Sequence, residues 1–443
     1  MRRGWSGGGA LALAAALAGA AAPAPLLGQD SGAAPVGVRV GINYNPGTRP
    51  SITVLPVAAA VLDSVRTILQ RDLDYSDRFE VLFPPSSVAM QGGAPNYAGL
   101  TALGTDLAVA LVPSAEAGGT VDVQLHDVHT GTLRHHLSVR LPGSGAALRL
   151  AVHRAADEVV SWVTGTPGVA ATEIIYAAAG RLWRVAPDGQ GLAAVPAAGR
   201  PVYSPAWSPD GRSIAYTAFV PSGRPIVLQD LASGSREIVP GTEYGVNITP
   251  EFSPDGRRLA YAHGDENGTD LYLFDVARKC CVSRLTVGRY YDNLSPSWSP
   301  DGQRLAFVST RAGQPQLYLM AADGSGQEAL ARFDYGATGQ SNGPEWSPDG
   351  QSVAFHREVG GVPQVFVVDV GTRAVRQITG EGRNEDPTWA PDGRHLAFVS
   401  SRGGARQLWV VDLETGRMRP IANTGGAQLP AWSPRHTSFT EAR

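Results

Sequence analysis

The chain has 443 residues, of which 43% are hydrophobic and 17% are charged, and its formal net charge is −3. This length suits two or three domains, and the near balance of charges argues against a nucleic-acid binder, which needs a strongly basic face. Glycine (53 residues) and proline (33 residues) are abundant, which favours many short strands joined by turns.

The N-terminal residues are typical of a secretory signal peptide. Arg2 and Arg3 precede a small apolar run, Ala10–Ala22, which is too short to span a bilayer. We assign residues 1–29 to this signal, with cleavage between Ala20 and Asp30. No cysteine lies near that junction and no later stretch is long and apolar enough to cross a membrane. We therefore expect an exported, soluble protein.

Residues 36–168 form the first predicted domain. Alternation of apolar and polar residues predicts strands, and a single apolar stripe predicts a helix. The predicted strands are 36–42, 52–57, 79–83, 107–112, 121–126 and 132–141, and the predicted helices are 61–73 and 148–163. The domain is therefore expected to be a mixed α/β sheet carrying two helices, followed by a linker at 165–168.

Four histidines lie on the predicted hairpin of this domain, at positions 126, 129, 135 and 136. A two-residue turn at Thr130-Gly131 would place His126 opposite His135, and two facing imidazoles with one further ligand can hold zinc. Asp127 points to the other face from His126, as neighbours on a strand do. We therefore expect solvated strand histidines and no metal site.

A repeat dominates the rest of the chain. Pro-Ala-Trp-Ser-Pro-Asp-Gly, at Pro205–Gly211, returns about every 45 residues, a period that indicates one propeller blade per repeat. The further copies are Pro250–Gly256, Pro296–Gly302, Pro344–Gly350, Pro387–Gly393, where Ala390 replaces serine, and the truncated Pro430–Pro434. Ser-Pro-Asp-Gly suits a type I turn, and apolar strands follow it.

The two ends of the repeat region complement each other. The last copy stops after its first strand, whereas residues 173–196 supply three strands without a first one. Joining these pieces closes a ring and leaves no open edge. Residues 173–443 are therefore predicted to form an all-β, six-bladed β-propeller with four antiparallel strands per blade.

The two cysteines, Cys280 and Cys281, are adjacent. Neighbouring residues cannot form an ordinary disulfide, which joins Cα atoms further apart. A vicinal disulfide is the alternative, but we expect two small buried thiols on a strand.

These motifs together resemble the TolB family. The run Ser204–Gly211 is similar to the blade signature of that family, as are the six copies and the split closing blade. The likeness extends to four further segments: Ile68–Leu73, Arg78–Glu80, Leu103–Asp106 and Leu148–Tyr176. The blade motif alone also occurs in prolyl-peptidase propellers, and the first domain makes the resemblance specific.

The resemblance implies a periplasmic scaffold of the Tol–Pal system, without catalysis or cofactor, that supports outer-membrane integrity and cell division. It implies that the propeller binds the peptidoglycan-associated lipoprotein Pal, and that the N-terminal segment with Val38, Val40 and Ile42 contacts the inner-membrane protein TolA. The Pal-binding loops would lead into the Pro-x-aromatic strands. Their candidate residues are Tyr203, Asn247, Asp292, Asn293, Asn342, Asn384, Glu385, Asp386 and Gln428. A closed ring has no edge to pair, so we expect a monomer.

A prolyl peptidase and a carbohydrate-binding propeller are the alternative functions. A prolyl peptidase would need an α/β-hydrolase domain with a Gly-x-Ser-x-Gly nucleophile elbow. We expect no such elbow in this chain, and the repeats leave no room for the domain. A propeller that binds peptidoglycan or another carbohydrate remains an alternative, with tyrosines 244, 290, 291 and 335 available for stacking. One aspartate per turn is no calcium cage, although Glu251, Glu345 and Asp386 could attract a cation loosely.

Overall fold

The computed structural model describes residues 49–57, 60–85, 88–90, 93–114, 119–331 and 339–435. All of them belong to one compact unit, Val38–Arg443. The expected signal segment, the expected strand at 36–42 with Val38, Val40 and Ile42, and Tyr335 lie outside the described residues.

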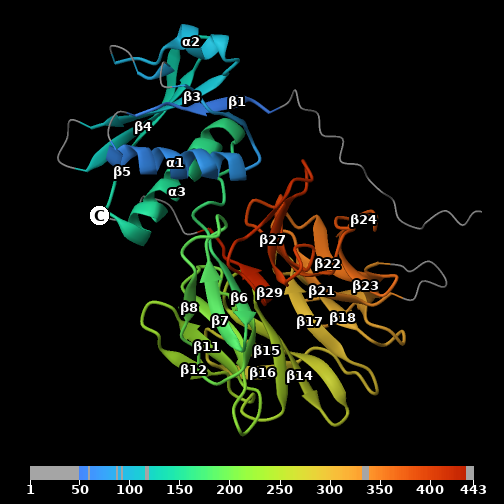
Figure 1. Ribbon diagram of the computed structural model, residues 1–443. Coiled ribbons are helices and arrows are strands. Elements are labelled where there is room, and N and C mark those ends of the chain that lie inside the picture. The colour runs from blue at the N-terminus through green and yellow to red at the C-terminus, as the bar shows by residue number, and fades with distance from the viewer. Residues whose placement is uncertain are drawn as a thin grey trace, which may run out of the picture. The chain divides into compact units, whose positions relative to one another are not determined.

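The first domain is a mixed sheet with three helices (Figure 1). Its strand order is β2-β1-β3-β4-β5, in which β1 pairs in parallel with β2 and β3, and the other pairs are antiparallel. The strands are β1 (Ser51–Val54), β2 (Glu80–Leu82), β3 (Leu107–Pro113), β4 (Thr120–Asp127) and β5 (Thr132–Arg140). The helices are α1 (Ala60–Tyr75), α2 (Tyr97–Ala102) and α3 (Gly145–Thr164).

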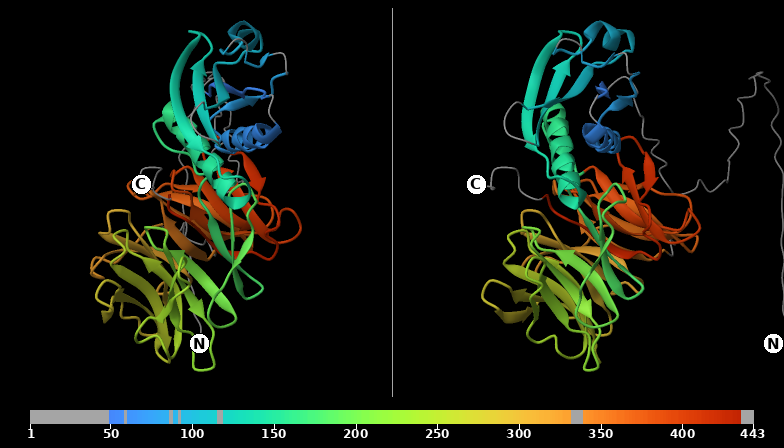
Figure 2. Two further views of the ribbon diagram at one scale, coloured as in Figure 1. Left: turned by 90° about the vertical axis from the view of Figure 1, so that its left-hand side faces the viewer. Right: turned by 60° about the vertical axis from the view of Figure 1, so that its left-hand side comes forward.

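Alternation along β3 divides the core of this domain between the two faces of the sheet. Leu107, Val109 and Leu111 pack with α1 and α3, which lie together on one face (Figure 2). Ala108 and Ala110 point the other way and pack with Leu100 of α2. Helix α2 is only six residues long and was not predicted from the sequence. Among the described residues, no helix is both long enough and apolar enough to cross a membrane.

The predicted pairing of the histidines is wrong by a register shift. His135 lies opposite Leu125, and His126 lies opposite Leu133, because the ladder shifts between Leu125 and His126. The ring of His126 instead hydrogen-bonds the Tyr97 hydroxyl at 2.9 Å, and that of His135 stacks on Trp162, 5.3 Å between centroids. The two imidazoles therefore have separate structural partners.

The repeats form six four-stranded antiparallel sheets, as predicted. In each repeat the first strand lies innermost, against the first strands of its two neighbours. Blades 1 to 3 are β9 (Val202–Trp207), β10 (Ser213–Ala218), β11 (Ile226–Asp230), β12 (Arg236–Ile238); β13 (Val246–Phe252), β14 (Arg258–Asp265), β15 (Gly268–Asp275), β16 (Cys280–Arg284); and β17 (Asn293–Trp298), β18 (Arg304–Ser309), β19 (Gln316–Ala321), β20 (Glu328–Ala329). Blades 4 and 5 are β21 (Ser341–Trp346), β22 (Ser352–Val359), β23 (Val362–Asp369), β24 (Val375–Gln377); and β25 (Asn384–Trp389), β26 (His395–Ser400), β27 (Gln407–Asp412), β28 (Met418–Pro420).

Blade 6 is the predicted composite of the two chain ends. It combines β29 (Gln428–Trp432) with β6 (Ile174–Ala178), β7 (Arg181–Val185) and β8 (Ala193–Val195). Trp432 lies opposite Ile174, and the indole Nε1 of Trp432 donates to Thr172 Oγ1 at 2.7 Å. The ring is therefore closed by antiparallel pairing between segments about 250 residues apart, which removes the edge that an open sheet would expose.

The aromatic residue of each repeat packs between neighbouring blades. Trp298 of blade 3, for example, clusters with Leu271 and Leu273 of blade 2. The guanidinium of Arg258, also in blade 2, lies 4.5 Å from the centre of the Trp298 ring. An aromatic at this position supplies large apolar area and a face for the cation, so one motif residue holds two blades together.

The expectation of two buried thiols is wrong. Cys280 and Cys281 are joined by a disulfide, and Cys281 is exposed. The pair opens β16, the outermost strand of blade 2, and no strand among the described residues pairs with its outer edge.

Candidate functional site: the propeller mouth and the interdomain contact

The six inner strands share one arrangement around the proline of the Pro-x-aromatic motif. We call the residue three positions before this proline the anchor residue, and the two residues directly before it the mouth residues. The anchor residues are all buried: Val202, Asn247, Asn293, Ser341, Asn384 and Ala427. The mouth residues are all half-buried: Tyr203 and Ser204, Ile248 and Thr249, Leu294 and Ser295, Asn342 and Gly343, Glu385 and Asp386, and Gln428 and Leu429.

Three of the predicted partner-binding residues, Asn247, Asn293 and Asn384, are anchor residues. Nδ2 of Asn247 donates to the carbonyl oxygen of Thr242, and Nδ2 of Asn384 donates to that of Glu381, both at 2.9 Å and both inside their own loops. Nδ2 of Asn293 donates instead to the carboxylate of Asp270 in β15, at 2.9 Å. All three side chains are fully buried. They shape the loops that lead into the inner strands, and they present no surface of their own to a partner.

A β-bulge aims the mouth residues of every blade. The ladder between the first and second strands shifts register at this point in all six blades. The mouth residue next to the proline has a φ between 48° and 58° in each blade: Ser204, Thr249, Ser295, Gly343, Asp386 and Leu429. Five of these six residues are not glycine and would by themselves disfavour a left-handed backbone, so the surrounding structure must stabilise this conformation. A bulge of this kind re-aims side chains, and here it does so six times around one ring.

The remaining predicted residues lie at or beside the mouth positions. Tyr203 packs edge-on against Phe219, 5.6 Å between centroids. Glu385 is ion-paired to Arg383 at 2.9 Å and to Arg406. Asn342 and Gln428 are half-buried mouth residues. Asp292 lies one position before an anchor residue and accepts from the backbone N–H of Thr269 at 3.1 Å.

Asp386 connects three blades. Its Oδ2 accepts from the backbone N–H of Leu429 in blade 6 at 3.2 Å, and its own N–H donates to Nδ1 of His356 in blade 4 at 3.2 Å. The side chain is therefore part of the ring as well as of its mouth, and its replacement would disturb both.

At the opposite ends of the inner strands the six motifs enclose a cavity of about 310 Å³. Glu251 and Glu345 are among its lining residues. Burial raises the pKa of Glu345 to about 7, although the Trp389 N–H and the Thr388 hydroxyl both donate to it. Burial and the nearby Glu345 raise the pKa of Glu251 well above its usual value. Asp386 lies at the mouth, away from this pair.

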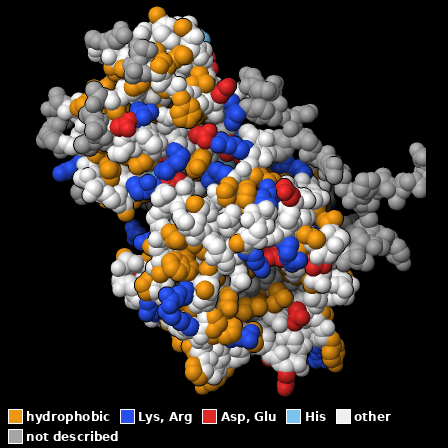
Figure 3. All heavy atoms as spheres, in the orientation of Figure 1, with side chains coloured by type: hydrophobic (Ala, Val, Ile, Leu, Met, Phe, Trp, Pro, Cys, Tyr) orange, Lys and Arg blue, Asp and Glu red, His pale blue; other side chains and the backbone are white. Residues whose placement is uncertain are grey.

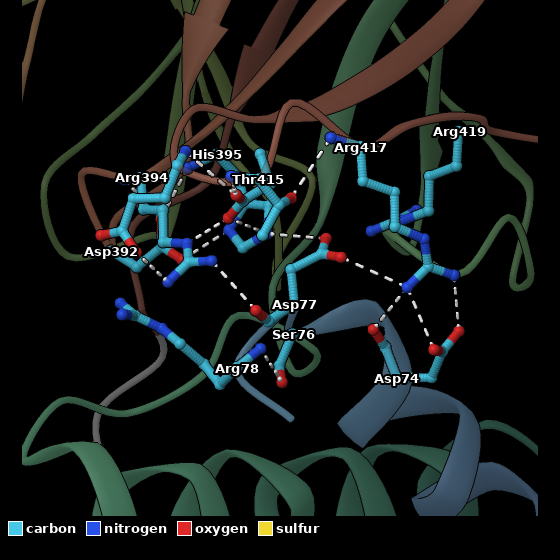
Figure 4. Close-up of polar contacts among 12 residues, drawn as sticks. Asp74, Ser76, Asp77, Arg78, Asp392, Arg394, His395, Thr415, Arg417 and Arg419 are labelled. Atoms are coloured by element: carbon cyan, nitrogen blue, oxygen red, sulfur yellow. Dashed lines mark hydrogen bonds and ion pairs between the residues drawn. The ribbon is translucent and has the colours of Figure 1, made fainter. Parts of the chain in front are cut away.

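A second polar site lies where α1 meets blade 5 (Figure 4). The last turn of α1 carries no basic residue, and the acidic side chains of Asp72, Asp74 and Asp77 gather there, which opposes the helix dipole. Arginines of the propeller supply the missing positive charge. Arg417 binds the Asp74 carboxylate at 2.7 Å and the Asp74 carbonyl oxygen at 3.0 Å, and Arg394 donates to the Asp77 carbonyl oxygen at 2.9 Å.

His395 lies at the centre of this contact and is buried. Its Nδ1 is 2.6 Å from Asp392, and its Nε2 is 3.4 Å from Asp77 and 3.5 Å from Asp412. Burial by itself would lower the pKa of His395, but these three carboxylates outweigh it and raise the pKa to about 9. The imidazole is therefore a cation at neutral pH, and with Arg394 it neutralises a cluster of buried carboxylates.

A parallel contact joins the two helices to the turn after β7. Asp188, in the Pro-Asp-Gly turn of blade 6, binds Arg71 of α1 and Arg149 of α3. Nearby, His153 of α3 binds Asp72 of α1 at 2.5 Å. Basic and acidic side chains are interspersed over this region of the surface (Figure 3). The sequence did not predict these residues as a site.

One deviation in the repeat does mark the contact in the sequence. In blades 1 to 4 the motif serine donates to the aspartate of its own turn, as Ser208 does to Asp210 at 2.6 Å. Blade 5 has Ala390 instead, and Asp392 binds His395. Because blade 5 lacks this hydroxyl, the carboxylate of its turn can join the interdomain cluster. The replacement of serine by Ala390 in the repeat is the sequence signal that could have indicated this site.

A Gly-x-Ser-x-Gly run does occur, at Gly339–Gly343. Its serine, Ser341, is a fully buried anchor residue at the start of β21, and its Oγ accepts from Nε of Arg357 at 3.1 Å. A nucleophile elbow needs an exposed serine on a strand-to-helix turn, so this run is part of a blade.

Comparisons with known proteins agree with this architecture. The family profile "PD40: TolB beta propeller domain" matches residues 160–338 and 332–441. "Tol-Pal system protein TolB" of Methylococcus capsulatus is 36% identical over 203 residues, which are 42% of this chain and 47% of the relative. The protein of the same name from Aromatoleum aromaticum is 33% identical over 241 residues, 52% and 53% of the two chains. This chain thus spans about half the length of the curated relatives that it matches.

A solved structure extends the likeness beyond the propeller. The crystal structure of TolB from Acinetobacter baumannii superposes with a TM-score of 0.75 at 25% identity, covering 87% of this chain and 97% of that one. Because the superposition covers 87% of this chain, it includes the first domain as well as the blades.

Proposed function

The chain belongs to the TolB family, and we propose that it serves as a non-enzymatic binding protein of a Tol–Pal system in the periplasm. Its propeller mouth binds a Pal-like lipoprotein, and its N-terminal segment with Val38, Val40 and Ile42 contacts a TolA-like inner-membrane protein. Residues 1–29 act as the export signal, residues 36–168 and 173–443 form the two domains, and the protein acts as a monomer in outer-membrane integrity and cell division. The name that the curated relatives carry, "Tol-Pal system protein TolB", supports this proposal.

One structural observation supports the choice of surface. Six bulges place twelve half-buried mouth residues, which differ from blade to blade in size, polarity and charge, at the same position on the six inner strands. A fixed scaffold with variable residues at the ends of its strands is typical of a binding surface.

The test compares two pairs of substitutions at opposite ends of the same inner strands. Asn342→Ala with Gln428→Ala changes mouth residues. Gln303→Ala with Gln351→Ala changes exposed residues of the Pro-Asp-Gly turns at the other end. Calorimetric titration of the full chain with the soluble domain of the host's Pal-like lipoprotein should show at least tenfold weaker binding for the first pair only.

Binding that is unchanged in the mouth variant but lost in the turn variant would show that the lipoprotein binds at the opposite end of the propeller. No binding by the unsubstituted chain would overturn the function altogether. A third variant, with Val38, Val40 and Ile42 changed to aspartate, should lose binding to a TolA-like partner and keep binding to the lipoprotein.

Carbohydrate binding is the second candidate, and one surface feature favours it. Tyr290 is 97% exposed at the edge of a cavity of about 330 Å³, lined also by Asp265, Asn267 and Arg289. An exposed aromatic ring beside carboxylate, amide and guanidinium groups suits stacking and hydrogen bonding to a sugar. If the unsubstituted chain binds peptidoglycan that lacks Pal, and the Tyr290→Ala variant does not, carbohydrate binding would be favoured over the scaffold function.

A further inference from the structure

The disulfide at the rim of blade 2 closes no loop of the chain. Cys280 and Cys281 are sequence neighbours, with Cα atoms 3.8 Å apart. A disulfide stabilises a fold mainly by restricting the unfolded chain, and the effect grows with the length of the loop that it closes. A bond between neighbours restricts almost nothing, so structural stabilisation does not explain this pair.

The position of the pair makes it accessible. β16 is the outermost strand in the order β13-β14-β15-β16, so its outer edge pairs with no described strand. Cys281 is exposed and Cys280 is half-buried. Thiol–disulfide exchange requires a thiolate to reach one of the two sulfur atoms, and exposed disulfides are the ones that react.

The backbone around the pair is irregular. The ladder places Leu273 opposite Ser283 and Asp275 opposite Cys280, so β16 contains one residue more than β15 over this stretch. Lys279 and Cys281 both have left-handed backbones, with φ of 56° and 64°. The disulfide thus occupies a bulge, where few ladder hydrogen bonds oppose a local rearrangement.

Three basic residues lie close to the cysteine pair in the sequence, and each of them binds a carboxylate. Arg278 and Lys279 precede the pair, and Arg284 ends the strand. Arg278 binds Asp275 at 3.8 Å, and Arg284 binds Asp270. Nζ of Lys279 also binds Glu237 of β12 at 2.6 Å, which connects the outer strands of blades 1 and 2 beside the disulfide.

We propose that Cys280–Cys281 is a thiol–disulfide exchange site for a dithiol reductant, and that its redox state controls the local order of β16. A thiolate of the dithiol attacks Sγ of Cys281, the Cys280–Cys281 bond breaks, and Sγ of Cys280 leaves as a thiolate and takes up a proton. The second thiol of the reductant then resolves the mixed disulfide and frees Cys281. Two electrons and two protons pass to the cysteine pair, and the dithiol becomes a disulfide.

The first experiment counts reactive thiols in the folded full chain. Intact mass after treatment with N-ethylmaleimide should show no adduct before reduction and two adducts after dithiothreitol in the absence of denaturant. Two adducts without reductant would show that the thiols are free, and adducts that require denaturant would show that the bond is inaccessible. Either result overturns the proposal.

The second experiment separates exchange from a structural role. Cys280→Ser with Cys281→Ser should melt within about 2 °C of the unsubstituted chain, because a bond that closes no loop contributes little. A fall of more than about 5 °C would make the bond structural and contradict the proposal. Hydrogen exchange of the backbone amides of residues 279–284 should accelerate at least threefold on reduction of the unsubstituted chain and stay unchanged in the double variant.

A protein reductant is tested with the same chain. A Cys-x-x-Cys oxidoreductase whose second cysteine is replaced by serine should be trapped as a mixed disulfide with Cys281, identified by peptide mass. If dithiothreitol reduces the site and no such adduct forms, the exchange with a protein dithiol is overturned and only small thiols remain as reductants.

Discussion

His395 carries a positive charge in the interior because three carboxylates surround it. Its pKa rises from 6.5 to about 9 on folding, so the folded state holds the proton more tightly than the unfolded state. The stabilisation is fully present below pH 6.5 and is lost as the pH rises through 9.

We therefore expect His395→Gln to remove a pH dependence. The free energy of unfolding of the unsubstituted chain should fall by on the order of 2–3 kcal/mol more than that of the variant between pH 6.5 and pH 9.5. Urea titrations at these two pH values measure the difference. His129→Gln, at an exposed ion pair with Asp106, is the matched control, and parallel behaviour of H395Q and the unsubstituted chain would contradict the expectation.

Glu345 gives a pH dependence of the same sign, because its pKa is also raised. Its carboxyl holds a proton up to a pH of about 7 in the folded state, against 4.5 when unfolded. The folded state is therefore favoured at low pH, and the advantage is lost as the pH rises from 4.5 through 7.

Glu345→Gln should stabilise the protein above neutrality. The amide oxygen can still accept from Trp389 and Thr388, while no charge has to be buried. We expect the variant to be more stable by about 1–2 kcal/mol at pH 8, after allowance for screening by water in the cavity, and equal to the unsubstituted chain near pH 4.5. Thermal unfolding at both values tests this, with the exposed Glu80→Gln as control. Lower stability of E345Q at pH 8 would show that the charged form is favoured.

Asp72 and Asp74 lie in the last turn of helix α1 and Asp77 follows it, and the propeller provides the cations that this end of the helix lacks. Its last turn is therefore ordered by a contact from a residue more than 300 positions away, Arg417. Local propensity predicts the helix, but its C-terminus depends on the second domain.

Arg417→Met should loosen this end of the helix. The change keeps most of the side-chain volume and removes the bonds to Asp74 and Asp77. We expect a loss of about 1 kcal/mol in the free energy of unfolding, modest because the pair is partly exposed. Backbone amides of residues 74–78 should exchange faster with deuterium. Arg278→Met, at an exposed pair on the rim, serves as the control. Unchanged exchange at 74–78 would mean that the arginine does not cap the helix.

The ring closes through β29, which brings the two ends of the propeller together. Trp432 of this strand is 6% exposed and binds Thr172 in the linker before β6. The same residue therefore joins blade 6, blade 5 and the start of the repeat region.

Trp432→Ala should destabilise the whole ring. A large buried side chain and a buried hydrogen bond are lost together, and we expect about 3–5 kcal/mol lower stability. Chemical unfolding measures the loss, and limited proteolysis should cut near β6 in the variant first. Trp409→Ala, a half-buried residue on the third strand of blade 5, should cost clearly less. An equal loss of stability in the two variants would mean that closure of the ring contributes no stability beyond the burial of a tryptophan.

Periodicity made the six-bladed propeller predictable. A turn signature that recurs about every 45 residues specifies one four-stranded unit per copy. The truncated last copy and the three extra strands near residue 173 then require closure between the chain ends. The apolar stripes of α1 and α3 were readable for the same reason, because a regular element repeats its burial pattern along the chain.

Features that depend on a single register or on a distant partner were not predictable in this way. A one-residue shift at Leu125 separated His126 from His135, and α2 is too short to show a period. Asn247, Asn293 and Asn384 looked like loop residues open to a partner, yet all three are buried. Asn247 and Asn384 bond their own loops, and Asn293 bonds Asp270 of β15. Cys280 and Cys281 form a disulfide, although neighbouring residues do not fit the geometry of an ordinary disulfide.

By itself, the sequence determined the blade number, the closure of the ring and the two-part organisation, because these follow from spacing along the chain and local hydrogen-bond chemistry. Only the tertiary structure decided which loop residues face the propeller mouth and which buried charges join α1 to blades 5 and 6. His395, Asp77 and Arg394 interact because the fold brings together segments about 320 residues apart. Their ionisation depends on burial and on neighbours, which no local pattern records.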